Sequence, residues 1–202
     1  MLLYLIRHGE TDWNVEQRCQ GFSDSPLNAT GKKQAEAIAR HLSGTRVEAI
    51  YSSTLSRAYE TAQIISKYHD ASVEAMDALR ELNQGEFEGL PLTELVESHA
   101  DFLERWLREP ADLVVPGGES LRQMQDRAWS ALENIVERHA DGNVVVVAHN
   151  LCIMALLCRI TKLDLTDFRR LRQDVGAINV VEFGGRWPHP VLVHMNDTCH
   201  LG

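Results

Sequence analysis

Residues 2–14 read Leu2-Leu3-Tyr4-Leu5-Ile6-Arg7-His8-Gly9-Glu10-Thr11-Asp12-Trp13-Asn14, an apolar run that passes directly into a polar loop. Five apolar residues in a row predict a buried strand that is too short to cross a membrane as a helix. Open α/β sheets bind ligands beyond the carboxyl ends of their strands, so Arg7, His8 and Gly9 mark a candidate site. They supply a permanent cation, a possible nucleophile and a glycine that allows close approach. A lone histidine after a strand is often only a hydrogen-bonded polar residue, so other residues must support this interpretation.

Length and charge limit the class of protein. The 202 residues fit one domain, and we expect a single domain over residues 1–202. The formal net charge of −9 argues against nucleic acid or an anionic membrane as the main partner, because both need a basic surface. The sequence has no run long enough to span a bilayer and no signal-peptide pattern, so we expect a cytoplasmic protein.

The four cysteines are scattered at Cys19, Cys152, Cys158 and Cys199. They form no CxxC pair, and no histidine is spaced to complete a zinc pattern. We therefore predict free thiols, with no metal site and no disulfide.

Strands and helices are predicted to alternate along most of the chain. Strands are expected over 2–6, 47–51, 73–76 and 143–148, and helices over 29–43, 55–69, 92–109, 121–139, 151–160 and 164–172. Asn28 is placed to cap the helix over 29–43, and Ser120 with Gln123 forms a capping box. Residues 178–183 and 191–194 resemble a closing β-hairpin. This alternation is typical of an α/β fold.

Further candidate groups follow other strands of the predicted sheet. Arg57 falls in the first turn of a helix, where a cation is unfavourable unless an anion lies opposite or the side chain turns to solvent. His149 and Asn150 stand where a buried strand meets a helix N-terminus, a position suited to an anion. The passage after 73–76 offers a general acid among the carboxylates Glu81, Glu86 and Glu88, and their spacing does not choose between them.

Two histidines, two arginines and a carboxylate make one chemical set. Guanidinium groups match phosphate oxygens and stabilise a phosphoryl transition state without a metal. A neutral imidazole can attack phosphorus, while a carboxylic acid protonates the leaving alkoxide and later activates water. Phosphate-ester chemistry is therefore the favoured interpretation.

Several motifs occur here in a specific order: Arg7-His8-Gly9-Glu10-Thr11, Gln20-Gly21, Tyr51-Ser52-Ser53, Arg57-Ala58, Arg80-Glu81, Pro116-Gly117-Gly118-Glu119-Ser120 and His149. Their order and spacing resemble the histidine phosphatase superfamily, in the branch of cofactor-dependent phosphoglycerate mutases and their phosphatase relatives. The resemblance covers nearly the whole chain. It implies a three-layer α/β/α fold around a mixed, mostly parallel sheet.

The resemblance also implies roles for individual residues. His8 would be the phosphorylated nucleophile, with Glu81 as general acid and base. Arg7, Arg57 and His149 would clamp the phosphoryl oxygens, without metal or cofactor. The expected substrate-binding residues are Asn14, Gln20, Gly21, Phe22 and Asn150.

The chain departs from the family pattern beside His149. Asn150 replaces the usual glycine, and we expect it to tolerate a left-handed backbone so that its N–H still faces the site. Ala148 and Thr54 replace a usual serine and a frequent aspartate.

Three functions are consistent with these residues. We favour a phosphomonoester hydrolase over a mutase, because the passage from Glu81 to Pro116 is short and its basic residues are only Arg105 and Arg108. A non-catalytic phosphate-binding protein would not need both a nucleophile and an acid. Residues 82–115 are expected to form a lid that selects the phosphomonoester. The substrate stays open among phosphoserine, phosphoglycerate, sugar phosphates and α-ribazole phosphate, as does the oligomeric state, a homodimer included.

Overall fold

In residues 1–139 and 141–202, which the computed structural model describes, six strands form one mixed sheet. The strands are β1 (Leu2–Arg7), β2 (Val47–Ser53), β3 (Val73–Met76), β4 (Asn143–Ala148), β5 (Ile178–Glu182) and β6 (Val191–Asp197). Their spatial order is β3-β2-β4-β1-β5-β6. The pairs β3–β2, β2–β4 and β4–β1 are parallel, while β5 runs antiparallel to both β1 and β6. The predicted strands and closing hairpin are confirmed.

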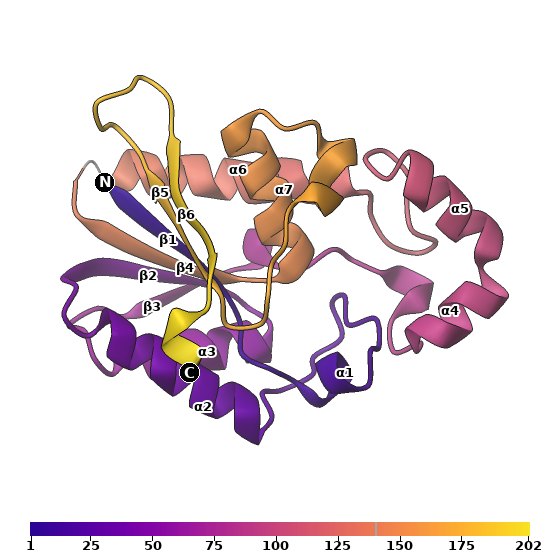
Figure 1. Cartoon of the computed structure of the whole chain (residues 1–202), viewed down its shortest axis with the longest axis horizontal. Coiled ribbons are helices and arrows are strands. Elements are labelled where there is room, and N and C mark those ends of the chain that lie inside the picture. Colours follow the sequence, from indigo (N-terminus) through magenta and orange to yellow (C-terminus); the bar gives the residue numbers. More distant parts are fainter. Residues whose placement is uncertain (140) are drawn as a thin grey trace.

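Helices cover both faces of the sheet (Figure 1). On one face α2 (Ala29–Leu42) and α3 (Ser56–Ser66) pack against alternate residues such as Val145 and Val147 of β4. On the other face α6 (Leu121–Arg138) and α7 (Asn150–Thr161) pack against Val144 and Val146. Because β4 is buried on both faces, it reads as an unbroken apolar run in the sequence. The three-layer α/β/α architecture is confirmed.

The predicted caps place the helix starts. The Asn28 side chain accepts a hydrogen bond from the Gly31 N–H at 2.8 Å and begins α2. Ser120 and Gln123 form the reciprocal capping box that begins α6. These bonds satisfy amide groups that have no partner inside their own helix. Both helix starts agree with the sequence prediction.

Three predicted helices differ from the structure. The helix predicted over 55–69 ends at Ser66, because the next three amides bond three residues back in a tighter turn. The helix predicted over 92–109 is divided into α4 (Leu92–Ser98) and α5 (Ala100–Arg108) by the non-helical backbone of His99. The segment predicted over 164–172 is a 3-10 turn over Leu165–Arg170, whose Thr166 amide donates to the Asp164 carboxylate. A short helix, α1 (Asp12–Val15), was not predicted.

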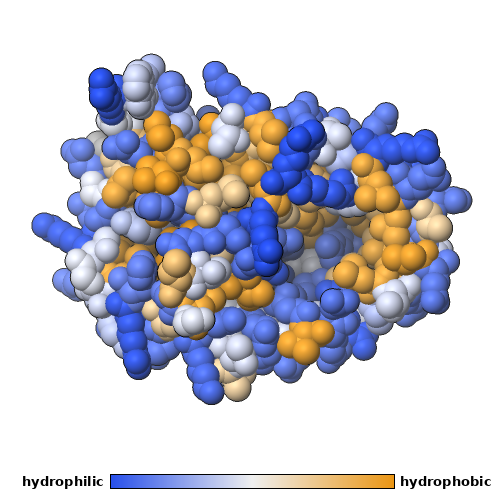
Figure 2. All heavy atoms as spheres, viewed as in Figure 1, coloured by the Kyte–Doolittle hydropathy of each residue, from blue (hydrophilic) through white to orange (hydrophobic). Residues whose placement is uncertain are grey.

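The segment predicted as a lid lies beyond the carboxyl ends of β1, β2 and β4 (Figure 1). It carries exposed apolar side chains, with Leu92 47%, Val96 60% and Leu107 67% exposed. Figure 2 shows apolar side chains gathered at the end of the molecule that α4 and α5 form. The lid role of 82–115 and the single-domain interpretation of 1–202 stay predictions. Among the described helices, none is both long and apolar enough to cross a membrane.

Candidate active site

A cavity of about 180 Å³ opens at the carboxyl ends of β1, β2 and β4. The predicted residues that line it are Arg7, His8, Asn14, Gln20, Gly21, Arg57, Glu81 and Asn150. They come from segments far apart in the sequence, and the parallel strands bring them to one edge of the sheet. The predicted site is therefore one physical pocket.

His8 follows β1 and is 3% exposed. Its Nδ1 lies 2.7 Å from the Gly9 carbonyl oxygen, which can only accept, so the neutral ring carries its proton on Nδ1 and keeps a lone pair on Nε2. Burial, then Arg57 and Arg7, hold the pKa of His8 well below its usual value. Gly9 does serve a close approach, since a Cβ there would lie 2.4 Å from the Gly31 carbonyl oxygen of α2. The buried imidazole is thus neutral at pH 7 and has its lone pair on Nε2.

His149 caps α7 and is fully buried beside His8. The two ring centroids lie 5.1 Å apart. Neither ring nitrogen of His149 has a hydrogen-bond partner among the described residues. Burial first, and then Arg57 and His8, hold its pKa well below the usual value. A buried imidazole with both nitrogens unpaired is suited to a ligand that supplies the missing partner.

Arg57 is fully buried although its side chain carries a charge. Its Nη1 donates to the Ser23 carbonyl at 2.9 Å, and its Nη2 donates to the Gly21 carbonyl at 2.8 Å. Its buried Nε has no partner in the described part of the chain. Burial lowers the pKa of Arg57 to about 10. The guanidinium is therefore held by two backbone oxygens and stays positive at neutral pH.

The loop that holds Arg57 depends on Gly21. This residue has a φ of 52°, and a Cβ on it would lie 2.2 Å from Oε1 of Glu88. The same carboxylate accepts the Phe22 N–H at 2.7 Å and the Ser23 N–H at 2.8 Å. Glu88 thus organises the loop whose carbonyls orient Arg57. Its oxygens are occupied by this structural task.

Arg7 is the last residue of β1, directly before His8, and lines the cavity. Its Nη1 donates to the Gln173 carbonyl at 2.5 Å and to Oδ1 of Asn150 at 3.4 Å. Burial lowers its pKa from the usual value. Asn150 lies in the first turn of α7 and is not among the described residues with positive φ, so the expected left-handed backbone is wrong. Asn150 instead contacts the clamp through its side chain.

Glu81 is the carboxylate of the three candidates that lines the cavity. It is 7% exposed, and its Oε1 accepts the N–H groups of Leu82 at 2.9 Å and Cys152 at 3.1 Å. Its Oε2 accepts the Leu151 N–H at 3.1 Å. The Leu151 and Cys152 amides stand in the first turn of α7, where the helix N-terminus favours a negative group. Glu86 is exposed, so the structure separates the three carboxylates that the sequence left open.

Two predicted residues are not part of the described cavity lining: His149, whose ring centroid lies 5.1 Å from that of His8, and Phe22. The Phe22 ring instead lies 5.3 Å from the Arg80 guanidinium and 5.6 Å from that of Arg127. Five further side chains line the cavity without being among the predicted site residues: Arg18, Cys19, Gln84, Leu92 and Leu151.

The chain belongs to the histidine phosphatase superfamily (branch 1), whose family profile matches residues 3–198. Within it, phosphoserine phosphatase 1 of Hydrogenobacter thermophilus is 36% identical over 200 residues, which cover 99% of this chain and 94% of the relative. The probable phosphoglycerate mutase GpmB of Salmonella choleraesuis is 33% identical over 202 residues, covering 98% of this chain and 94% of its own length.

Solved structures agree with this assignment. Bacillus stearothermophilus YhfR has a TM-score of 0.93 and 30% identity, with 100% of this chain and 99% of the other covered. A phosphoserine phosphatase of Entamoeba histolytica in complex with phosphoserine has a TM-score of 0.88 and 29% identity, with 99% and 98% covered. Family and relatives together make this chain a phosphatase that hydrolyses phosphomonoesters, and they do not favour the mutase alternative.

Proposed function

We propose that the chain hydrolyses small phosphomonoesters through a phosphohistidine on His8, with Glu81 as general acid and base. Arg7, Arg57 and His149 bind the phosphoryl oxygens, and Asn14 adds a further donor. Gln20, Gly21 and Asn150 contact the substrate from the cavity lining. This assignment extends to residue level the activity that the family defines.

One observation supports the proposal above the others: buried nitrogens without partners gather around His8. Within the described residues these are Nε of Arg7, Nε of Arg57 and both ring nitrogens of His149. A buried unpaired donor costs about 1–3 kcal/mol, so several in one place are favourable only when a ligand with many acceptor oxygens binds there. A phosphoryl group is such a ligand.

The residues account for both halves of the reaction. Nε2 of His8 attacks phosphorus, a nitrogen–phosphorus bond forms, and the ester oxygen leaves with a proton from Glu81. The Glu81 carboxylate then removes a proton from water, which attacks phosphorus as the nitrogen–phosphorus bond breaks. Inorganic phosphate leaves and His8 returns to its neutral state. The two arginines offset the charge that develops on the phosphoryl oxygens.

The size of the cavity bears on the substrate. The cavity of about 180 Å³ is smaller than the roughly 300–1,000 Å³ of pockets that take drug-sized ligands. We therefore place small alkyl phosphates such as phosphoserine or phosphoglycerate ahead of nucleotide-sized esters. Initial rates over a panel of phosphate esters, ranked by kcat/KM, test this order. A cytoplasmic location stays a prediction.

His8→Ala tests the nucleophile. We expect it to abolish phosphate release, because it removes the atom that forms the covalent intermediate. Labelled substrate should leave acid-labile, base-stable phosphate on the unsubstituted protein and none on His8→Ala. Label that persists on His8→Ala at the same level would contradict the assignment.

Glu81→Gln tests the acid. Positioned acid catalysis is worth about 10²–10⁴-fold, so phosphorylation of His8 by an alkyl phosphate should slow by that order. p-Nitrophenolate leaves without a proton, so the burst from p-nitrophenyl phosphate should be largely spared. Glu86→Gln is the matched control and should change neither rate. Equal losses for both esters in Glu81→Gln, or leaving-group dependence in Glu86→Gln, would show that the acid is another residue.

A further inference from the structure

A second arginine near the site, the part-buried Arg127 of α6, binds the segment of Glu81 and lies outside the cavity lining. All five of its N–H donors are engaged, which is unusual for a side chain with so many. Nη1 donates to the carbonyls of Ala78 at 2.8 Å and Arg80 at 2.9 Å. Nη2 donates to the Glu81 carbonyl at 2.7 Å and to Oε1 of Glu119 at 2.6 Å, and Nε donates to Oε2 of Glu119 at 3.1 Å.

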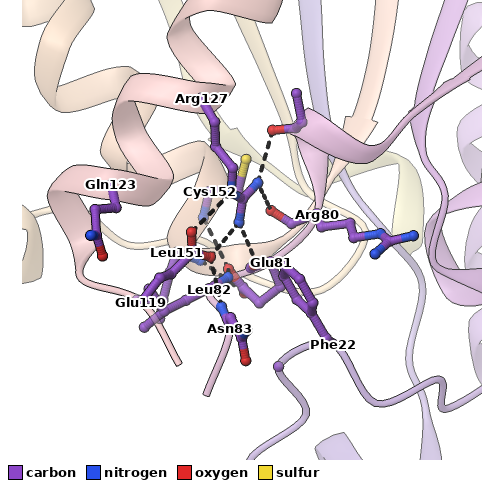
Figure 3. A network of polar contacts seen from close by, with 12 residues as sticks. Phe22, Arg80, Glu81, Leu82, Asn83, Glu119, Gln123, Arg127, Leu151 and Cys152 are labelled. Atoms are coloured by element: carbon purple, nitrogen blue, oxygen red, sulfur yellow. Dashed lines mark hydrogen bonds and ion pairs between the residues drawn. The ribbon is translucent and has the colours of Figure 1, made fainter. Parts of the chain in front are cut away.

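These contacts converge on the backbone that carries the proposed acid (Figure 3). Residues 80–84 connect two 3-10 turns, Asp77–Leu79 and Gly85–Phe87, and form no strand or helix of their own. Their carbonyls therefore need partners from elsewhere, and Arg127 bonds those of Arg80 and Glu81 as well as that of Ala78 in the preceding turn. Glu119 completes the arrangement from the other side, because its Oε1 accepts the Asn83 N–H at 2.8 Å. The Arg127–Glu119 pair holds the segment on both sides of Glu81.

The pair is largely removed from solvent. The Arg127 side chain is 23% exposed and that of Glu119 is 16% exposed. The Phe22 ring lies against the Arg127 guanidinium at 5.6 Å. In such surroundings charge-assisted hydrogen bonds are shorter and stronger than neutral ones, so they restrict the backbone more tightly. Phe22 thus packs against Arg127, and it does not line the cavity.

We propose that Arg127, held by Glu119, is a positioning residue that fixes the Glu81 carboxylate relative to the phosphoryl group on His8. The inference rests on the proposed role of Glu81. Arg127 touches no reacting atom in this arrangement. It acts chiefly on the proton-transfer steps, because all its hydrogen bonds go to the segment that carries the acid or to Glu119, and none goes to the phosphoryl clamp.

The test compares an alkyl phosphate with p-nitrophenyl phosphate in Arg127→Met. Misplacing a catalytic group by about 1 Å can cost on the order of 10²-fold, so His8 phosphorylation by the alkyl ester should slow by about 10- to 100-fold. The p-nitrophenyl burst, which needs no acid, should keep its rate per folded molecule. In the double variant with Glu81→Gln, the loss on the alkyl ester should not exceed that of Glu81→Gln alone.

Matched variants separate positioning from loss of fold. Asp126→Asn removes an exposed ion pair with Arg159 one residue away on α6, and it should change neither ester. Glu119→Gln and Arg127→Lys each keep part of the network and should show the same leaving-group dependence to a smaller extent. They also provide the comparison if Arg127→Met does not fold.

The outcomes distinguish the inference from the proposed function. If Glu81→Gln shows leaving-group dependence while all Arg127 and Glu119 variants slow both esters equally, Glu81 remains the acid and the positioning role is wrong. Losses of Arg127→Met and Glu81→Gln that multiply in the double variant would also overturn the positioning role. If Glu81→Gln itself shows no such dependence, the proposed acid fails and the inference fails with it.

Discussion

Two arginines lie near the candidate site, the fully buried Arg57 and the part-buried Arg127. They differ in how many of their hydrogen-bond donors have a partner. Arg57 donates to two backbone carbonyls and leaves a buried Nε without a partner among the described residues. Arg127 has every donor engaged. The phosphoryl side of the pocket thus keeps unused hydrogen-bonding capacity, whereas the support behind the acid keeps none.

This difference separates groups that bind a ligand from groups that hold a structure. Unpaired buried donors lower the stability of the empty site and are offset by the packing of the rest of the fold. A saturated network contributes stability and restricts movement. The number of unused donors is therefore a physical criterion for which of two buried cations meets the substrate.

The largest expected effect comes from removing the cation with unused donors. Arg57→Met should lower kcat/KM by about 10³-fold, because a fixed cation that stabilises phosphoryl charge is worth 10³–10⁵ in related chemistry. Its free energy of unfolding should change little, since a costly buried charge leaves together with two hydrogen bonds. Steady-state kinetics and urea unfolding on the same preparation measure both quantities.

Arg127→Met should show the reverse balance. Breaking a buried ion pair leaves Glu119 uncompensated and costs about 3 kcal/mol of unfolding free energy. The loss in kcat/KM should be smaller than for Arg57→Met. A larger loss of stability in Arg57→Met than in Arg127→Met would remove the distinction between the two sites.

Gly21→Ala sharpens the comparison on the phosphoryl side. The positive φ of Gly21 and the contact of a new Cβ with Glu88 should lower stability by about 2 kcal/mol. Activity should fall as well, because the Gly21 carbonyl orients Arg57. Gly44→Ala is the control, since a Cβ there meets no described atom within 4 Å. Equal unfolding midpoints for the two variants would contradict this account.

The buried histidines should make stability fall with acid. Burial lowers the pKa of His8 and His149, so below about pH 6.5 the unfolded chain binds protons that the folded chain does not. The unfolding free energy should then decrease as the pH falls from 7 toward 5, by up to about 1.4 kcal/mol per pH unit for each histidine. No such contribution arises above pH 7.

Burial also lowers the pKa values of His69 and His200, so these histidines contribute to the same pH dependence. The variant His149→Gln is therefore needed to isolate the contribution of His149. Urea unfolding between pH 7 and 5 should give a shallower dependence in this variant. An unchanged slope would mean that His149 is not held neutral in the folded chain.

The smallest expected effect is that of a chelator. Because Arg7 and Arg57 supply the positive charge that the phosphoryl oxygens need, and neutral His149 adds a hydrogen-bond donor, phosphate release should be unchanged by EDTA. If EDTA abolished activity and Mg²⁺ restored it, a metal ion and not these residues would supply the positive charge.

The comparison between the arginines also explains what sequence reasoning could reach. Arg57 was found because a cation in the first turn of a helix is electrostatically out of place. Arg127 was missed because the pattern of α6 predicts only an apolar stripe, with Met124 as a member. An arginine beside such a stripe ordinarily extends its charged end into solvent. Its partners are backbone carbonyls of an irregular segment, which leave no trace in the sequence. A signal did exist in Glu119, a carboxylate directly before the capping box.

Local patterns succeeded where burial and periodicity alone determine structure. The run over 143–148 gave β4, and the apolar residues after it gave α7. The division of the lid helix at His99 was not foreseen, because it depends on tertiary packing. The Phe87 ring lies 4.7 Å from the His99 ring and packs edge-on against the Phe102 ring at 4.9 Å. Choosing Glu81 over Glu88 from the residues alone failed for the same reason, since both are loop carboxylates until the fold brings one to α7.

The position of β1 inside the sheet has a consequence for synthesis. His8 directly follows β1, yet the two neighbours of β1, which are β4 and β5, come from far later in the chain. While a ribosome makes the protein, the strand before the proposed nucleophile must wait unpaired until both neighbours have emerged. The α2, β2 and α3 segment can collapse earlier, so the reactive centre is the last part to be assembled. An incomplete nascent chain is therefore without activity, and its apolar residues 2–6 are the segment most in need of protection from aggregation.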